Sequence, residues 1–164
     1  MKISKSSRHS KITGDFAERL ILYWLSKYGF ECAFVDHTGL DIIARNPHTH
    51  ELMGISVKSR SRNTGTEATV LRIAGDELPR VDAACRAFGC QPYFAIVVDA
   101  ADLICAWMVP KKRFLKLCEW KHGGHVYWKM GTKHLEQYAS DPAVKAFQFS
   151  TKTLNWWAPA KRKS

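Results

Sequence analysis

The chain has 164 residues, of which 46% are hydrophobic and 24% charged, a composition that predicts one globular domain with a hydrophobic core and short tails. Lys and Arg outnumber Asp and Glu by 25 to 15, and the formal net charge of +10 favours a polyanionic partner such as DNA. No apolar run approaches the roughly 20 residues of a membrane span, so we expect no membrane partner. The basic N-terminus has no apolar signal core behind it, and the five cysteines are an odd number. We therefore expect reduced thiols and a cytoplasmic location.

The N-terminal segment, residues 1–11, is polar and basic and lacks the periodicity of a helix or a strand. This composition predicts a flexible basic arm. Arg8 and Lys11 in the arm are candidate contacts to DNA phosphates. A simple solvated terminus explains the same residues equally well.

Beyond the arm, hydrophobic periodicity predicts alternating helices and strands. Thr13 suits a helix N-cap and Gly29 a C-cap, and Glu18 lies between the apolar rows of that helix, where it is typical of a surface acid. Further helices are expected over 76–88 and 111–117, and strands over 30–36, 40–44, 52–59, 92–98 and 103–109. This order predicts a single α/β domain over 12–118, with helices flanking a central mixed five-stranded sheet.

Two further segments are candidates for DNA contacts. Ser59, Arg60 and Arg62 begin a polar, basic loop that would project beside any site on the preceding strand, although an ordinary surface loop is the alternative. Residues 119–164 form an irregular, aromatic-rich C-terminal extension, expected either to pack on the domain or to contact DNA. Its Trp156–Trp157 pair, followed by basic residues, suits base stacking. Aromatic residues that cap a small core are the alternative.

The stretch from Gly39 to Arg60 places charged residues in apolar strands. Asp41 is a lone carboxylate in an apolar strand, which is costly to bury unless it is paired or binds something. Because strand side chains alternate, Ser56 and Lys58 share one face of the next strand. A salt bridge at a strand end is the simplest explanation. With Glu18 added, the set also suits a sheet edge at which two acids hold a divalent cation.

In this order the residues resemble the PD-(D/E)xK nuclease superfamily, and within it the archaeal Holliday junction resolvase-like branch. The resemblance covers about residues 11–118 and rests on Gly14–Glu18, Gly39–Ile42 and Ile55–Lys58. It implies a restriction-endonuclease-like fold and a Mg²⁺ or Mn²⁺ ion held by Glu18, Asp41 and the Val57 carbonyl. The ion would polarise the scissile phosphate and supply a hydroxide. Lys58 would orient or deprotonate the attacking water, or offset charge in the transition state.

Ser56 departs from the family pattern, which has Glu or Asp two residues before the lysine. A hydroxyl is neutral and binds Mg²⁺ more weakly than a carboxylate does. Glu51 cannot replace it on a regular strand, since an odd separation puts it on the opposite face. Three outcomes are open: a weaker metal site, an acid that has migrated from elsewhere, such as Asp36 or Glu67, or lost catalysis with DNA binding kept.

We therefore expect a resolvase-like, metal-dependent DNA endonuclease that acts on branched or duplex DNA. The alternative is a non-catalytic nucleic-acid-binding module that keeps the nuclease fold. A homodimer would suit symmetric cutting of two strands, but the residues reveal no interface. Cys118, His122, His125 and His134 have spacings that could serve zinc, although a polar Gly-Gly loop explains them better.

Overall fold

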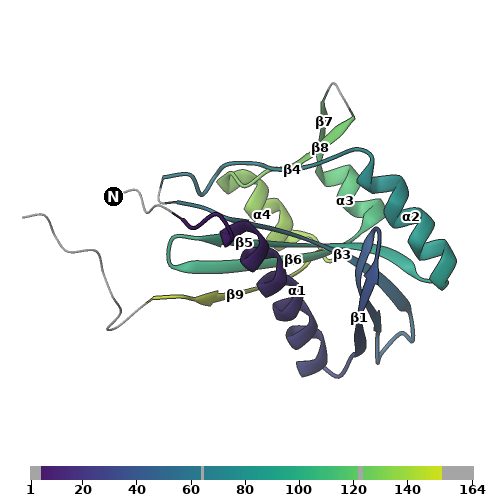
Figure 1. Cartoon of the computed structure of the whole chain (residues 1–164). Helices are drawn as coiled ribbons and strands as arrows, with labels where there is room; N and C mark the ends of the chain where they lie inside the picture. Colours follow the sequence, from purple (N-terminus) through teal and green to yellow (C-terminus); the bar gives the residue numbers. More distant parts are fainter. Residues whose placement is uncertain (1–4, 64, 122–123, 153–164) are drawn as a thin grey trace, which may run out of the picture.

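The computed structural model describes residues 5–63, 65–121 and 124–152 (Figure 1). The helices and strands are, in chain order, α1 (His9–Lys27), β1 (Glu31–His37), β2 (Leu40–Arg45), β3 (Leu52–Ser61), β4 (Leu71–Ile73), α2 (Glu77–Phe88), β5 (Gln91–Ala100), β6 (Leu103–Pro110), α3 (Lys111–Leu117), β7 (Glu119–Lys121), β8 (His125–Trp128), α4 (Thr132–Ser140) and β9 (Lys145–Ser150). The predicted helices and strands of the α/β domain are all present. No helix within these ranges has the length and hydropathy needed to span a bilayer.

The central sheet is mixed, as predicted, and among the described residues it has six strands rather than five. Its order is β1-β2-β3-β5-β6-β9. The sixth strand, β9, comes from the C-terminal extension and pairs antiparallel with β6, from Leu103 opposite Ser150 to Met108 opposite Lys145. Within this sheet β3 and β5 are the parallel pair, because the chain crosses between them through α2.

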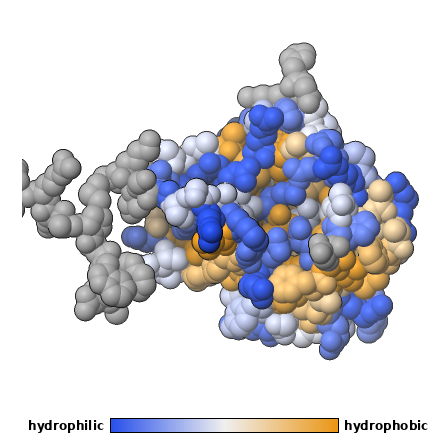
Figure 2. Space-filling model, in the orientation of Figure 1, coloured by the Kyte–Doolittle hydropathy of each residue, from blue (hydrophilic) through white to orange (hydrophobic). Residues whose placement is uncertain are grey.

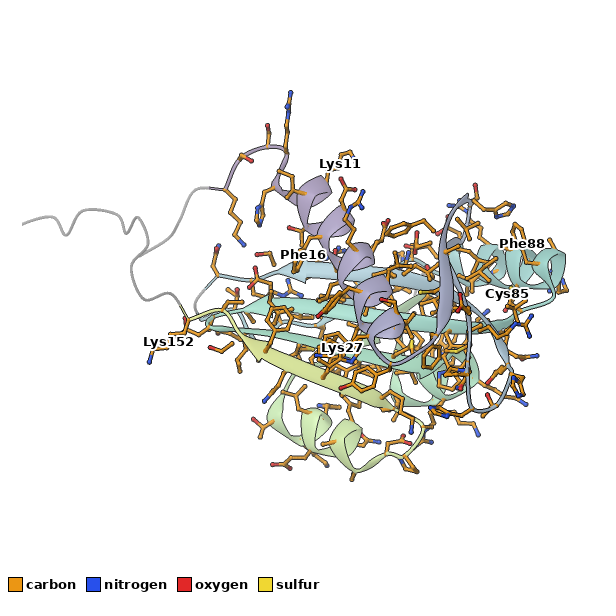
Figure 3. The ribbon with its side chains drawn as sticks, turned by 90° about the horizontal axis from the view of Figure 1, so that it is seen from below. Lys11, Phe16, Lys27, Cys85, Phe88 and Lys152 are labelled. Atoms are coloured by element: carbon orange, nitrogen blue, oxygen red, sulfur yellow. The ribbon has the colours of Figure 1, made fainter. Side chains whose placement is uncertain are left out.

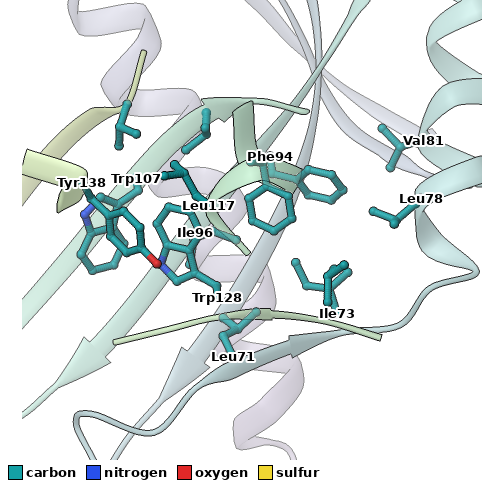
Figure 4. Packing of buried hydrophobic residues seen from close by; sticks show 14 of the residues in the cluster. Leu71, Ile73, Leu78, Val81, Phe94, Ile96, Trp107, Leu117, Trp128 and Tyr138 are labelled. Carbon is teal, nitrogen blue, oxygen red and sulfur yellow. The ribbon is translucent and has the colours of Figure 1, made fainter. Parts of the chain in front are cut away.

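The extension is regular over its described part, which corrects the irregular segment expected from the sequence. β7 and β8 form a hairpin, and β8 pairs with β4 to make a second sheet of three strands. Trp128 of β8 is fully buried and stacks on Tyr138 of α4, with ring centroids 3.9 Å apart (Figure 4). The extension is therefore part of the hydrophobic core. Trp156–Trp157 lies outside the described residues, so base stacking by this pair stays a prediction.

Two hydrophobic clusters form the core. In the first, Ala17, Ile21 and Leu25 of α1 pack against the strands of the central sheet, including the cross-strand pair Ile42–Ile55. Figure 3 shows α1 lying across the near side of this sheet. The second cluster joins residues of α2, α3 and α4 with both sheets. Burial of each large side chain contributes about 1.5–3 kcal/mol, which orders the strands that carry the polar residues described below.

Helix α1 begins at His9, one turn earlier than the sequence predicts. Thr13 is not its N-cap; the Thr13 hydroxyl donates instead to the His9 carbonyl at 2.7 Å, inside the helix. Lys11 therefore lies on α1 rather than in an arm. The apolar row of Ala17, Ile21 and Leu25 is buried, as its spacing predicts, whereas Phe16, in the second apolar row expected on this helix, is 42% exposed. Figure 2 accordingly shows hydrophobic surface among hydrophilic surface on the face in view.

Candidate active site at the end of the β2–β3 ladder

Asp41 lies where β2 and β3 separate. The antiparallel ladder between these strands ends at the pair Ile42–Ile55. One residue beyond it, the Asp41 carboxylate accepts the backbone N–H of Val57 at 2.6 Å and a hydrogen bond from the Ser56 side chain. The carboxylate thus makes a hydrogen bond to β3 where the backbone ladder has ended, and this bond sets its position.

Asp41, Ser56 and Lys58 line one open pocket of about 300 Å³. Glu77, in the first turn of α2, lines the same pocket and forms an ion pair with Lys58. The chain leaves the carboxyl end of β3 before it forms α2 and returns as the parallel strand β5. This crossover brings the N-terminus of α2 back over the carboxyl end of β3.

Gly39 allows α2 to approach the pocket. Its φ is +99°, a conformation that L side chains rarely adopt, and a Cβ atom at this position would lie 2.7 Å from the backbone of Arg80. The α2 backbone therefore packs directly on the turn before β2. Since Glu77 is on α2 and Asp41 is on β2, this contact keeps the two acids at one pocket.

Glu18 on α1 borders a second hollow that Asp41 also lines. This groove is open, with a volume of about 450 Å³, and Asp15 and Arg19 lie in it as well. Burial raises the pKa of Glu18 above its ordinary value, and the negative charges of Asp41 and Asp15 raise it further. Asp41 is thus shared by two adjoining hollows, with Glu18 in one and Glu77 in the other.

Asp41 carries a negative charge in unfavourable surroundings. Burial raises the pKa of its carboxyl group, and the charge of Glu77 adds to the rise. The N–H of Val57, the ammonium of Lys58 and the hydroxyl of Ser56 act in the opposite direction. A divalent cation beside Asp41 would stabilise the ionised form.

The donors around Asp41 suit a hard divalent cation such as Mg²⁺. The carboxylates of Asp41, Glu18 and Glu77 and the hydroxyl of Ser56 all offer oxygen ligands. Across residues 5–63, 65–121 and 124–152, no three Asp, Glu, His or Cys side chains are already close enough to hold a metal ion. The chemistry of the set fits the ion, and the acids would have to close on it.

Two acids were considered from the sequence and lie outside the pocket: Glu51, which strand alternation excluded as a replacement for the missing carboxylate, and Glu67, which was a candidate. Glu51 accepts a hydrogen bond from the Tyr93 hydroxyl at 3.2 Å, beside the opposite end of β3. Glu67 accepts a backbone N–H within its own loop at 2.9 Å. The side chain of Asp36 is outside the described part of the chain. The sequence analysis placed Glu77 in a helix and did not name it as a site residue. The feature that could have identified it is its position in the first turn of the helix that follows the Lys58 strand.

A basic groove of about 320 Å³ lies beside the carboxyl end of β3. Because β3 continues to Ser61, Ser59 and Arg60 are strand residues paired with β5 and not part of the loop that the sequence predicts. They line the groove together with the segment that precedes α1. Lys5 in that segment donates to the Ser61 hydroxyl at 2.7 Å, which holds the segment against β3.

The remaining basic candidates differ in their availability to a ligand. The Arg62 guanidinium donates to the carbonyls of Thr69 and Val70 at 3.0 and 2.9 Å, so it ties its own loop together. Arg8 is exposed at the N-terminus of α1, and Lys11 is exposed and paired with Asp15. Arg60 also donates to a carbonyl, that of Ser59 at 2.8 Å, but Arg60 and Lys5 are exposed whereas Arg62 is half-buried, so the first two are more accessible to a ligand.

The alternative zinc set is not assembled among the described residues. Burial raises the pKa of Cys118 to about 12, which disfavours the thiolate that zinc needs. The His125 imidazole forms a hydrogen bond with Arg72 at 2.8 Å. His122 lies outside the described residues, and Cys118, His125 and His134 do not form a three-ligand cluster in the part that is described.

The chain has the fold of an archaeal resolvase. The Holliday junction resolvase Hjc of Archaeoglobus fulgidus, an archaeal hyperthermophile, is similar to it with a TM-score of 0.55 and 22% sequence identity, over 76% of this chain and 88% of that chain. The restriction-endonuclease-like α/β fold expected from the sequence is therefore confirmed. No protein-family model matches the chain, and no curated protein is significantly similar to it.

Proposed function

We propose that this protein is a metal-dependent endonuclease that hydrolyses phosphodiester bonds in branched or duplex DNA. The observation that carries the proposal is the position of Asp41, a half-buried carboxylate held by the Val57 N–H beside Lys58 at the end of a strand ladder. The resolvase-like fold and the net charge of +10 support it. A homodimer would place two such sites on the two strands of one substrate.

The roles of the residues follow from their positions. A Mg²⁺ or Mn²⁺ ion, held by Asp41, Glu18 and the Val57 carbonyl, would supply Lewis-acid polarisation of the phosphate and a water of lowered pKa. The Val57 N–H and the Ser56 hydroxyl orient the Asp41 carboxylate. The Lys58 ammonium orients the attacking water or offsets the charge that develops on the phosphate.

Purified protein is expected to cut a labelled four-way junction or duplex DNA with Mg²⁺ and to stop when EDTA removes the metal. Lys58→Ala should lower the cleavage rate by about 100-fold, because it removes the ammonium that lines the pocket with Asp41. Gel assays of cleavage and of binding measure the two effects separately. Clean protein that binds DNA but neither cuts it nor binds Mg²⁺ or Mn²⁺ would contradict the enzyme proposal.

A second candidate function is a non-catalytic nucleic-acid-binding module. Ser56 favours it, since this residue is neutral and 2% exposed where the family pattern has an acid. A wild-type protein that is inactive and gains cleavage on Ser56→Glu would support the second candidate over the first.

The basic groove is the proposed phosphate contact. Changing Lys5 and Arg60 together to Ala should weaken DNA binding and make the slope of log affinity against log salt shallower by about 2, since each phosphate contact contributes about 0.9. Lys133→Ala on α4 removes one exposed charge outside this groove and serves as the control. Fluorescence anisotropy at several salt concentrations measures the slope. An unchanged slope in the double variant would move the DNA contact elsewhere.

A further inference from the structure

We infer that Glu77 supplies the carboxylate that β3 lacks at Ser56, so that the first turn of α2 adds a third acid to Asp41 and Glu18 at the metal site. The inference rests on the proposed function and names a residue of that site that the family pattern does not contain. It also gives the neutral residue at position 56 a physical explanation, since the negative charge enters the pocket from another element.

Ser56 and Glu77 reach the same pocket from different sides. The short Ser56 side chain is almost fully buried and hydrogen-bonds to Asp41, so it does not extend into the open part of the pocket. Glu77 contacts Lys58, which lies two residues after Ser56 on the same face of β3. The Glu77 carboxylate is therefore above the strand face from which an acidic side chain at position 56 would project.

The charges at the pocket agree with this assignment. Glu77 is close enough to Asp41 to disfavour its ionised form, so the two carboxylates act on one another across the pocket. Lys58 balances the charge of Glu77 in the metal-free protein. Glu77 would hold a bound divalent ion in place of the Lys58 ammonium, and Lys58 would then be available to water or phosphate.

The neighbouring acid is not equivalent to Glu77. Asp76 also lines the pocket, but it pairs with Arg80 at 2.6 Å and its side chain is 61% exposed, against 30% for Glu77. A purely structural explanation of Glu77 exists as well. An acid in the first turn of a helix interacts favourably with the helix dipole, and an ion pair as exposed as the one with Lys58 adds little stability. That explanation predicts no change in metal affinity when the charge is removed.

The test compares Glu77→Gln, Asp76→Asn, and the double variant Ser56→Glu with Glu77→Gln. Mn²⁺ binding is measured without DNA by calorimetry, and cleavage is measured separately. Glu77→Gln should weaken Mn²⁺ binding at least about tenfold, the size expected for loss of a group in a metal site. Asp76→Asn removes the same charge one residue away and should stay within about twofold of wild type. The double variant should recover both Mn²⁺ binding and cleavage.

The outcomes separate this inference from the function on which it rests. Wild-type protein that binds no Mn²⁺ overturns the proposed function and the inference together. Wild type and Glu77→Gln with equal Mn²⁺ affinity overturn the inference alone. A double variant that has a native circular dichroism spectrum but no recovery of Mn²⁺ binding also overturns it, because position 56 would then not be the place that Glu77 fills.

Discussion

Asp41→Asn is expected to lower DNA cleavage by at least about 100-fold while leaving the protein folded. The amide cannot supply the negative charge that a divalent cation requires, and the site loses the one acid that borders both hollows. The amide oxygen of the variant would still be able to accept the Val57 N–H, so the end of the β2–β3 ladder should keep its geometry.

Stability distinguishes this role from that of a structural salt bridge. Burial raises the pKa of Asp41 in the folded protein, so stability falls as the pH rises from the ordinary pKa through the folded one, and the cost is complete above the folded pKa. An uncharged amide avoids that cost. Urea unfolding at pH 7 should therefore give Asp41→Asn a midpoint equal to or above that of wild type.

Asp102→Asn is the matched control for Asp41→Asn, since it makes the same change in the exposed turn between β5 and β6. It should leave the cleavage rate unchanged and should alter the unfolding free energy by no more than about 0.5 kcal/mol. If Asp41→Asn cuts DNA at the wild-type rate, Asp41 is not an active-site residue. One that unfolds at neutral pH would support the simpler structural role.

Trp128→Ala should cost about 3–5 kcal/mol of unfolding free energy, the largest stability effect that we expect in this chain. Trp128 is fully buried between aromatic rings of α3 and α4, with Phe114 5.5 Å and Tyr138 3.9 Å from it, centroid to centroid. Its indole N–H has no hydrogen-bond partner among the described residues, so the loss is one of packing. Urea denaturation at constant m-value measures the change.

Trp120→Ala is the control in the same small sheet. Trp120 is on β7 and 53% exposed, so its removal should change stability by no more than about 0.5 kcal/mol. If Trp128→Ala costs less than about 1 kcal/mol, then β8 and α4 do not unfold cooperatively with the central sheet. The C-terminal extension would then be an accessory to the fold and not part of its core.

Local sequence patterns are enough to predict most of the helices and strands and part of the candidate site. A continuous run of apolar residues predicts β5 as a buried strand. Asp41 is recognisable as a candidate site residue because it is the one acid in the apolar strand β2. Strand alternation puts Ser56 and Lys58 on one face without any knowledge of the fold. The identity of a strand and the face of each side chain depend on residues close by in the sequence, so the periodicity of the sequence predicts them.

Features that depend on contacts between distant residues become visible only in the folded chain. The edge strand β9 alternates half-buried Phe147 and Phe149 with exposed residues, but this short pattern does not show where the strand belongs, and only its pairing with β6 makes it the sixth strand of the sheet. Trp128 became a core residue because β4, α3 and α4 enclose it. Glu77 joined Asp41 and Lys58 because the α2 crossover returns the start of the helix to the end of β3. A periodic pattern records which face a side chain occupies, whereas the partner across the pocket is set by chain topology.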